Sequence, residues 1–229
     1  MSKFMRLSKI IGEEKVDLMS KKCVLVLGCG GVGGYVCEGL VRSNIGKIII
    51  VDFDVVDESN INRQIIALES TIGMKKVDVL EKRIKDINKN CEVIKVDKFI
   101  DASNLCDLFK YDIDYFVDAC DTISTKKAVI DECLARGIKF IESMGTGNKF
   151  DPTKLEIIDI RKTVNDPLAR IIRKYVKDKK INKKIMVLSS LELPVKTGDI
   201  TPGSTAFVPA CAGFTIASFI VRELMEIDN

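Results

Sequence analysis

CVLVLGCGGVG, at Cys23–Gly33, joins an uninterrupted apolar run to a glycine-rich turn. An apolar run of this length is typical of a strand that is buried on both faces of a parallel sheet. The next segment, Val32–Ser43, has the length and the apolar spacing of a helix. Glycines in such a turn let a phosphate approach the backbone, and the helix N-terminus offers it N–H groups and a positive dipole. The stretch therefore predicts a nucleotide site at the turn.

Strand and helix patterns alternate on the C-terminal side of this unit. Further strands are predicted at Lys47–Asp52, Glu92–Val96, Asp114–Ala119 and Lys139–Ser143, and helices at Lys75–Asn88 and Thr125–Arg136, with Ser124 as the candidate N-cap of the second helix. Repeated β-α-β units with buried strands predict an α/β fold of the Rossmann type, with a doubly wound and mostly parallel sheet.

The regular alternation of strand and helix patterns ends at Gly145, and GTGNKFDPT (145–153) is predicted to be a loop. Strands are predicted at 155–160 and 185–190, a basic helix at 167–177, a Gly/Pro/Thr-rich crossing at 194–204, and a last helix at about 210–227. We expect one domain over residues 1–229. Its nucleotide-binding core covers about 20–145, and a C-terminal antiparallel extension on the substrate side covers about 146–229.

Composition narrows the class of protein further. With 229 residues and 46% hydrophobic content, the chain has enough apolar surface for one sizeable core. The N-terminus lacks the uninterrupted apolar region of a signal peptide, and the eight scattered cysteines form no CxxC pair. We therefore expect reduced, buried thiols in a cytoplasmic protein. The charge-free stretch Thr201–Val221 contains prolines and glycines, which favours a buried helix over stable membrane association.

The sequence contains no histidine. Imidazole is the usual general base near neutral pH, so removing a proton from a hydroxyl or a water would need an unusual substitute. This absence favours chemistry in which the nucleophile is already ionised.

Asp52 lies nineteen residues beyond Gly33, at the end of the second predicted strand. An acidic side chain at this position binds ribose hydroxyls in many nucleotide-binding folds. A nicotinamide-dependent dehydrogenase would show the same loop and the same acid. These two features therefore predict a nucleotide and leave its identity open.

Charged residues beyond Asp52 indicate which kind of nucleotide the site binds. VDFDVVDESNINRQ (51–64) ends with Arg63 and two amides, and Lys76 opens the next helix. Asp118 and Asp121 are predicted at the mouth of the fourth strand, on the edge where ligands of such sheets bind. Cations and a metal-binding carboxylate suit a triphosphate that is being cleaved, because they stabilise the charge that grows on pyrophosphate. A nicotinamide site has no need of them.

These motifs resemble those of the ubiquitin-activating-enzyme superfamily, which includes the bacterial adenylyltransferases of molybdopterin and thiamine synthesis. The resemblance covers about residues 4–224 and implies that the chain binds magnesium-ATP and adenylates a carboxylate. By motif, the implied nucleotide-binding residues are Gly28, Gly30, Gly31 and Gly33 of the loop, Asp52 and Asp54 of the DxD strand end, Asn60, Arg63, Gln64, Lys76 and Asp121. Arg63 and Lys76 would act on the phosphates in catalysis, and Asp121 would hold the metal.

The resemblance also implies a homodimer. An N-terminal arginine of this superfamily often reaches the γ-phosphate in the partner subunit, and Arg6 occupies the matching position here. Sulfur-carrier adenylyltransferases usually carry two CxxC pairs for structural zinc. This chain has no CxxC pair, so we expect no zinc. Nothing marks a catalytic cysteine, and we expect Cys29 and Cys211 to be buried core thiols. The motifs leave binding of a monovalent cation open.

The second half of the chain indicates the branch of the superfamily. Segments 145–153, 160–177 and 203–214 look like those of the tRNA threonylcarbamoyladenosine dehydratases. The implied substrate is tRNA that carries threonylcarbamoyladenosine next to the anticodon. Its threonyl carboxylate is ionised and would attack the α-phosphate of ATP without a general base. The carbamoyl group would then close a ring and release AMP, by an intramolecular step that needs mainly positioning.

A basic segment, Arg161–Lys184, holds ten Lys/Arg and two Asp/Glu in a chain whose net charge is only +3. An RNA stem needs such cations for phosphate contacts, although a solvated helix face would look the same. The candidate RNA contacts are Arg170, Arg173, Lys174, Lys177, Lys179, Lys180, Lys183 and Lys184. Two alternatives remain open from the sequence: an adenylyltransferase for the C-terminal glycine of a ubiquitin-like sulfur carrier, and a non-catalytic nucleotide-sensing module.

Overall fold

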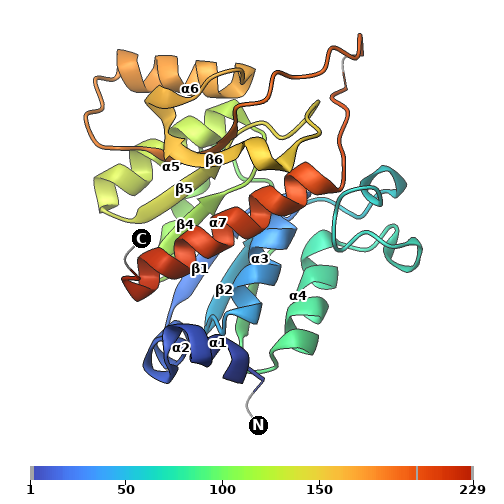
Figure 1. Ribbon diagram of the computed structural model, residues 1–229, viewed down its shortest axis with the longest axis vertical. Coiled ribbons are helices and arrows are strands. Elements are labelled where there is room, and N and C mark those ends of the chain that lie inside the picture. The colour runs from blue at the N-terminus through green and yellow to red at the C-terminus, as the bar shows by residue number, and fades with distance from the viewer. Residues whose placement is uncertain (1–2, 200, 228–229) are drawn as a thin grey trace.

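A seven-stranded sheet forms the centre of the molecule in the computed structural model, which describes residues 3–199 and 201–227 (Figure 1). The strand order is β3-β2-β1-β4-β5-β7-β6, and every neighbouring pair is parallel except β6 and β7. The strands are β1 (Cys23–Leu27), β2 (Lys47–Val51), β3 (Glu92–Val96), β4 (Tyr115–Asp118), β5 (Lys139–Ser143), β6 (Leu155–Asp159) and β7 (Met186–Ser190). The predicted doubly wound, mostly parallel sheet with an antiparallel C-terminal extension is confirmed.

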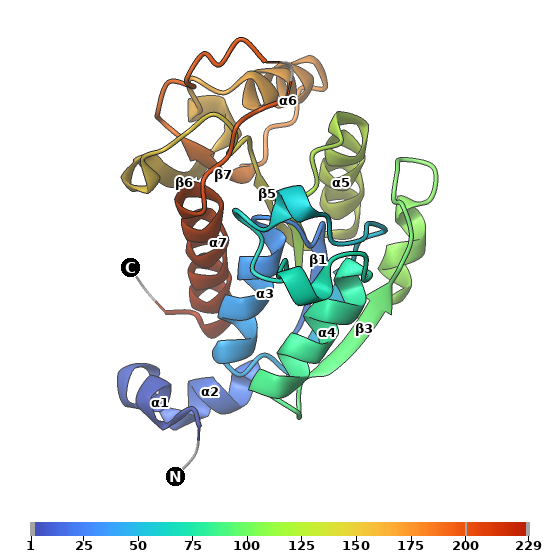
Figure 2. The ribbon, with the colours of Figure 1, turned by 90° about the vertical axis from the view of Figure 1, so that its right-hand side faces the viewer.

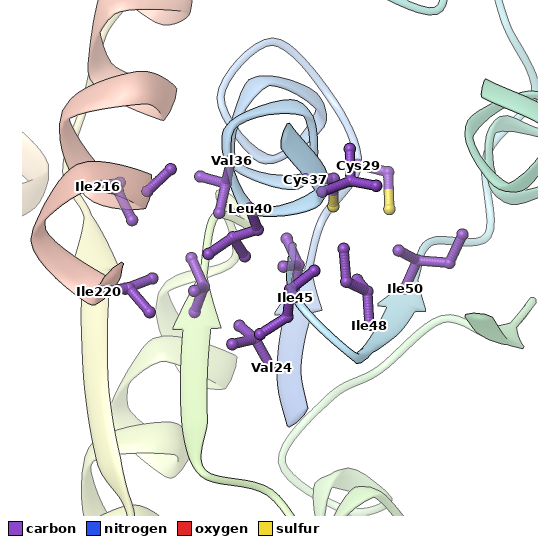
Figure 3. Packing of buried hydrophobic residues seen from close by; sticks show 14 of the residues in the cluster. Val24, Cys29, Val36, Cys37, Leu40, Ile45, Ile48, Ile50, Ile216 and Ile220 are labelled. Carbon is purple, nitrogen blue, oxygen red and sulfur yellow. The ribbon is translucent and has the colours of Figure 1, made fainter. Parts of the chain in front are cut away.

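Helices cover both faces of the sheet (Figures 1 and 2). They are α1 (Met5–Ile11), α2 (Glu13–Met19), α3 (Gly33–Arg42), α4 (Lys76–Ile87), α5 (Ile123–Arg136), α6 (Pro167–Asp178) and α7 (Phe207–Met225). Successive residues of a strand point to opposite faces, so Val24 and Val26 pack with α3, α4 and α7, while Leu25 and Leu27 pack with α5 and α6. Figure 3 shows Val36 and Leu40 of α3 beside Ile216 of α7 in the first of these two cores.

Most predicted elements agree with the structure within two residues, but two expectations were wrong and two helices were missed. The residue that caps α5 is Thr122, not Ser124, and it makes no side-chain cap hydrogen bond. Helix α7 begins at Phe207, three residues earlier than expected, and Pro209 is tolerated in its first turn, where a missing N–H costs nothing. The short helices α1 and α2 were not predicted; each is only seven residues long.

Helix α7 is the one helix in residues 3–199 and 201–227 that is long and apolar enough to cross a membrane by length and composition. In the structure it lies along α3, against the first core (Figure 1). The expectation that every cysteine is buried was wrong for three of them, of which Cys120 is half-buried. Cys211 lies on the outward side of α7, between the exposed rings of Phe207 and Phe214, and Cys106 is also exposed.

Candidate nucleotide-binding site

A cavity of about 430 Å³ opens at the carboxyl ends of β1, β2 and β4. This volume lies within the range of small-molecule sites, and the position is where ligands of doubly wound sheets bind. The cavity gathers ten of the residues that the sequence predicted, from segments far apart in the chain: Gly28, Gly30, Gly31, Asp52, Asp54, Asn60, Arg63, Gln64, Lys76 and Asp121. Gly33 and Arg6 are not among the residues that line it.

The glycine turn has two residues that no other amino acid replaces easily. Gly28 has a φ of 90°, and a Cβ on it would lie 2.9 Å from the backbone of Ala119. A Cβ on Gly33 would lie 1.8 Å from the carbonyl oxygen of Gly28, so this glycine packs the start of α3 against β1. Gly30 and Gly31 instead line the cavity and leave their backbone open to a ligand.

Asp52 ties the turn to the end of β2. Its Oδ2 accepts a hydrogen bond from the Cys29 N–H at 2.7 Å, and its Oδ1 accepts one from the Asp54 N–H at 2.9 Å. Both bonds are to backbone groups, so they fix the carboxylate in place beside the phosphate turn. The predicted ribose-binding acid is thus also the residue that positions the glycine loop.

Two cations line the cavity. Lys76 Nζ lies 2.8 Å from Asp54 Oδ2, and the lysine side chain is only 7% exposed. The Arg63 guanidinium donates through Nη1 to the Ser59 carbonyl and to Asn62 Oδ1, both at 2.8 Å. These bonds hold the guanidinium through a single nitrogen. Its remaining N–H groups can therefore donate to a ligand, and charge-assisted bonds to phosphate are the strong ones that such groups make.

Two buried amides complete this wall. The Asn60 Oδ1 accepts from the Asp57 N–H at 3.2 Å and closes the short 3₁₀ turn Glu58–Asn60. The Gln64 side-chain amide faces Gly30, and within the described residues its buried Oε1 has no hydrogen-bond donor. A buried acceptor without a donor costs free energy, and a ligand hydroxyl or amine would satisfy it.

The two aspartates after β4 have different surroundings. Asp121 is exposed at the cavity. Asp118, which was also predicted at the mouth of the strand, is instead fully buried: its Oδ2 lies 3.3 Å from Lys126 Nζ, and its Oδ1 accepts from the Cys120 N–H at 3.0 Å. Burial lowers the pKa of Lys126, but the opposing effects, of which the charge of Asp118 is the largest, outweigh burial and raise it. Asp118 therefore supports the loop that carries Asp121 and does not face a ligand.

Sequence reasoning missed an aromatic wall of the cavity. The rings of Phe53 and Phe99 meet edge to face, with centroids 4.9 Å apart and an interplanar angle of 87°. Ile100 and Lys98 line the cavity beside them. This wall could have been predicted from the sequence, since residues 98–100 follow β3 at the same edge of the sheet as the other strand ends. An apolar wall with a few polar groups is what a flat heterocycle needs.

No thiol in the described chain has the surroundings of an activated nucleophile at this cavity. Cys29 is fully buried, as expected, and burial raises the pKa of its thiol well above the ordinary value. Cys120 lines the cavity, and burial raises its pKa as well. A thiol with a raised pKa is a poor nucleophile because the thiolate is the reactive form.

The donor set suits a metal that arrives with phosphates. In residues 3–199 and 201–227, no three His, Cys, Asp or Glu residues converge on one point. Mg²⁺ is commonly bound through one or two carboxylates together with substrate phosphates and water. Asp121 offers one carboxylate at the cavity, while the Asp54 carboxylate is paired with Lys76. The residues present therefore fit magnesium that is carried by a nucleotide.

The fold and the cavity define an α/β protein with a nucleotide site at the carboxyl edge of its sheet. The model of the ThiF family matches residues 2–188. The chain is 40% identical to a tRNA threonylcarbamoyladenosine dehydratase of Bacillus subtilis (strain 168), over 97% of this chain and 94% of that protein. It is 36% identical to the enzyme of the same name from Escherichia coli (strain K12), over 74% of this chain and 63% of that protein.

A solved structure agrees with these sequence similarities. The E. coli tRNA N6-threonylcarbamoyladenosine dehydratase in complex with ATP superposes with a TM-score of 0.92 at 32% identity, over 98% of this chain and 94% of that one. The protein therefore belongs to the ThiF family and, within it, to the branch of the tRNA threonylcarbamoyladenosine dehydratases.

Proposed function

We propose that the protein uses ATP to dehydrate and cyclise threonylcarbamoyladenosine in tRNA through an acyl-adenylate. The observation that carries this proposal is the cavity in which Arg63, Lys76 and Asp121 converge beside the glycine turn. Two cations and one free carboxylate form the set that a triphosphate undergoing cleavage requires. The similarity to dehydratases over almost the whole chain supports the choice of substrate.

The first step forms a mixed anhydride. A threonyl carboxylate oxygen attacks the α-phosphorus of ATP, and the bond to the β-phosphate oxygen breaks, so that pyrophosphate leaves. Lys76 and Arg63 stabilise the charge that grows on the leaving oxygens, and the N–H groups at the start of α3 hold the phosphates. No protein base is needed, which agrees with a sequence that lacks histidine.

The second step closes the ring. The carbamoyl group attacks the acyl carbon, the acyl–phosphate bond breaks, and AMP leaves, with one proton released from the carbamoyl nitrogen. The net change in the tRNA is the loss of one water. Ring closure is intramolecular, so the carbamoyl group, once positioned beside the acyl carbon, reacts faster than water from solution.

Asp121 is the residue that would hold magnesium, whose charge would offset part of the negative charge of the phosphates. Gln64 and Asp52 would bind the hydroxyls of the nucleotide. The edge-to-face pair Phe53–Phe99 offers the apolar wall for its base.

The proposal includes a homodimer in which Arg6 reaches the nucleotide of the partner subunit. Arg6 is exposed on α1, and α1 lies at the amino end of the strands, away from the cavity of its own chain (Figure 1). An arginine so placed acts on a nucleotide only across a subunit interface. We expect the reaction to take place in the cytoplasm because its proposed substrate is tRNA.

The test is ATP turnover with three substrates: tRNA that carries threonylcarbamoyladenosine, the same tRNA as an unmodified transcript, and a ubiquitin-like protein that ends in glycine. We expect equal amounts of AMP and pyrophosphate with the modified tRNA alone. Turnover with the ubiquitin-like protein and none with tRNA would contradict the proposal and favour the sulfur-carrier alternative. Binding of ATP without turnover in every case would favour a nucleotide-sensing module.

A further inference from the structure

The basic segment Arg161–Lys184 divides into two surfaces in the structure. On α6, Arg170, Arg173, Lys174 and Lys177 follow the spacing i, i+3, i+4, i+7, so they share one face of the helix. The buried residues of α6 are Ala169, Ile172 and Val176, which pack in the core with α5. The cationic stripe therefore faces away from the sheet, where Figure 1 shows α6 at the outside of the molecule.

Other lysines of the segment belong to different surroundings. Lys179 Nζ lies 3.5 Å from Asp131 Oδ2 of α5, so its charge has a partner. Lys183 and Lys184 line a separate hollow beside Glu223 of α7. Sequence position alone groups these lysines with the stripe, but in the structure Lys179 pairs with Asp131, and Lys183 and Lys184 line a different hollow.

A cavity of about 850 Å³ lies between the stripe and the turn at 181–182. Nine residues line it, and none is acidic: Arg161, Arg170, Arg173, Lys174, Val176, Lys177, Lys180, Ile181 and Asn182. Positive charge in excess of the neighbouring carboxylates repels itself, and it is stabilised by an anion that binds there.

Two arginines form a rigid frame for this cavity. Arg161 donates to both carboxylate oxygens of Asp159, at 2.7 and 3.0 Å, and to the Lys183 carbonyl at 3.0 Å. Arg173 donates to the Thr163 hydroxyl at 2.6 Å. These bonds fix the two guanidinium groups in the walls.

Four other cations are exposed and have no ion pair within the described residues: Arg170, Lys174, Lys177 and Lys180. The three on α6 span about 10 Å of helix, at 1.5 Å for each residue. That length exceeds a single phosphate group and suits several phosphates of one chain. Phosphate contacts of this kind fix position and register without reading the bases.

We propose that this cationic surface, defined as Arg170, Lys174, Lys177 and Lys180 with the cavity they line, binds the sugar-phosphate backbone of the tRNA substrate. The proposal rests on the proposed function for the identity of the RNA. An anionic membrane is the less suitable partner, because a surface-bound helix inserts an apolar face and the apolar face of α6 is packed against the core. The surface would hold a stem of the tRNA while the modified nucleoside enters the nucleotide cavity.

Two variants with equal loss of charge test the proposal in the full-length protein. The first is R170Q/K174Q/K177Q, on the stripe; the second is K179Q/K183Q/K184Q, on the other surfaces. Filter binding of modified tRNA is measured at several salt concentrations, together with KM for tRNA and for ATP. Thermal unfolding midpoints confirm that both variants fold.

We expect the first variant to raise KM for tRNA on the order of tenfold or more. It should also flatten the slope of log K against log salt by roughly 0.7 to 0.9 for each tRNA phosphate that the variant no longer binds. Its KM for ATP stays near the wild-type value. The second variant should keep a salt slope close to that of the wild type.

Equal effects of the two variants would overturn the proposal, because net charge alone would then explain binding. Unchanged tRNA binding by the first variant would also overturn it, even if the wild type makes the cyclic product. Wild-type protein that binds vesicles of anionic lipid and not tRNA would overturn it as well. If the wild type binds tRNA without turnover, the proposed function fails, and the two salt slopes still decide whether this surface binds RNA.

Discussion

Lys76 Nζ lies 2.8 Å from Asp54 Oδ2, and the two groups differ in exposure, because the lysine side chain is 7% exposed and the aspartate 47%. The carboxylate thus holds a nearly buried ammonium at the wall of the cavity. A preorganised cation in such a site stabilises charge on a leaving group without reorganising during the reaction. The pair is therefore the centre of the proposed adenylation chemistry.

The first prediction concerns Lys76. K76M should lower kcat for AMP formation by about 10² to 10³-fold, the range for loss of one preorganised donor. The matched control is K75M, which removes the neighbouring charge; Lys75 is exposed and pairs with Asp97 outside the cavity. Steady-state kinetics with modified tRNA measure both. Equal losses in the two variants would show that Lys76 acts only through net charge.

The second prediction concerns Asp121. D121N should abolish most activity and leave the unfolding midpoint unchanged, because this exposed carboxylate has no structural partner in the described residues. D112N is the control, since Asp112 is exposed and does not line the cavity. The assay is the rate over a magnesium titration. A near-normal rate for D121N at every magnesium concentration would mean that the residue holds no metal.

The third prediction follows from the buried neighbours Asp118 and Glu142, which face each other in the register of β4 and β5. Burial raises the pKa of the Glu142 carboxyl well above its ordinary value of 4.5, against the opposing charge of Lys126. Above pH 4.5 the native state then binds more protons than the unfolded state, so the free energy of unfolding falls as pH rises.

E142Q removes this contribution, so its stability should fall less between about pH 5 and pH 8 than that of the wild type. Urea unfolding at several pH values measures the difference. E156Q serves as the control, because Glu156 is exposed on β6. If E142Q and the wild type show the same dependence on pH, Glu142 is ionised in the native protein.

The fourth prediction tests the proposed dimer. R6A and K76A should each be nearly inactive, and mixing them under conditions of subunit exchange should restore part of the activity, because one site in each heterodimer keeps both cations. Mass spectrometry establishes that heterodimers form. Heterodimers without recovered activity would show that Arg6 serves its own chain or none.

The fold was predictable from the sequence where the pattern of apolar residues is long and regular. Buried strands such as Cys23–Leu27 read as apolar runs, and α4 reads as an amphipathic helix with Leu80 and Ile84 on its buried face. Helix ends were harder to predict from the sequence. The start of α7 at Phe207 depends on how Val208 and Ala212 pack against the first core, which is a tertiary effect.

The candidate site was largely predictable from the sequence because its residues follow strand ends, and parallel strands end at one edge of the sheet. Residues whose environment depends on packing were not. Asp118 and Asp121 are three positions apart, yet one pairs with buried Lys126 and the other faces the cavity. Cys211 sits in an apolar segment but on the outward side of its helix, so composition predicted burial wrongly.

Nucleoside analysis of the tRNA tests the central proposal most directly. tRNA that carries threonylcarbamoyladenosine is incubated with the protein, ATP and magnesium, digested to nucleosides, and analysed by mass spectrometry, with K76M as the negative control. We expect the modified nucleoside to lose the mass of one water, in step with AMP release and only when ATP is present. A modified nucleoside of unchanged mass, recovered while the protein turns over ATP, would contradict the proposed function.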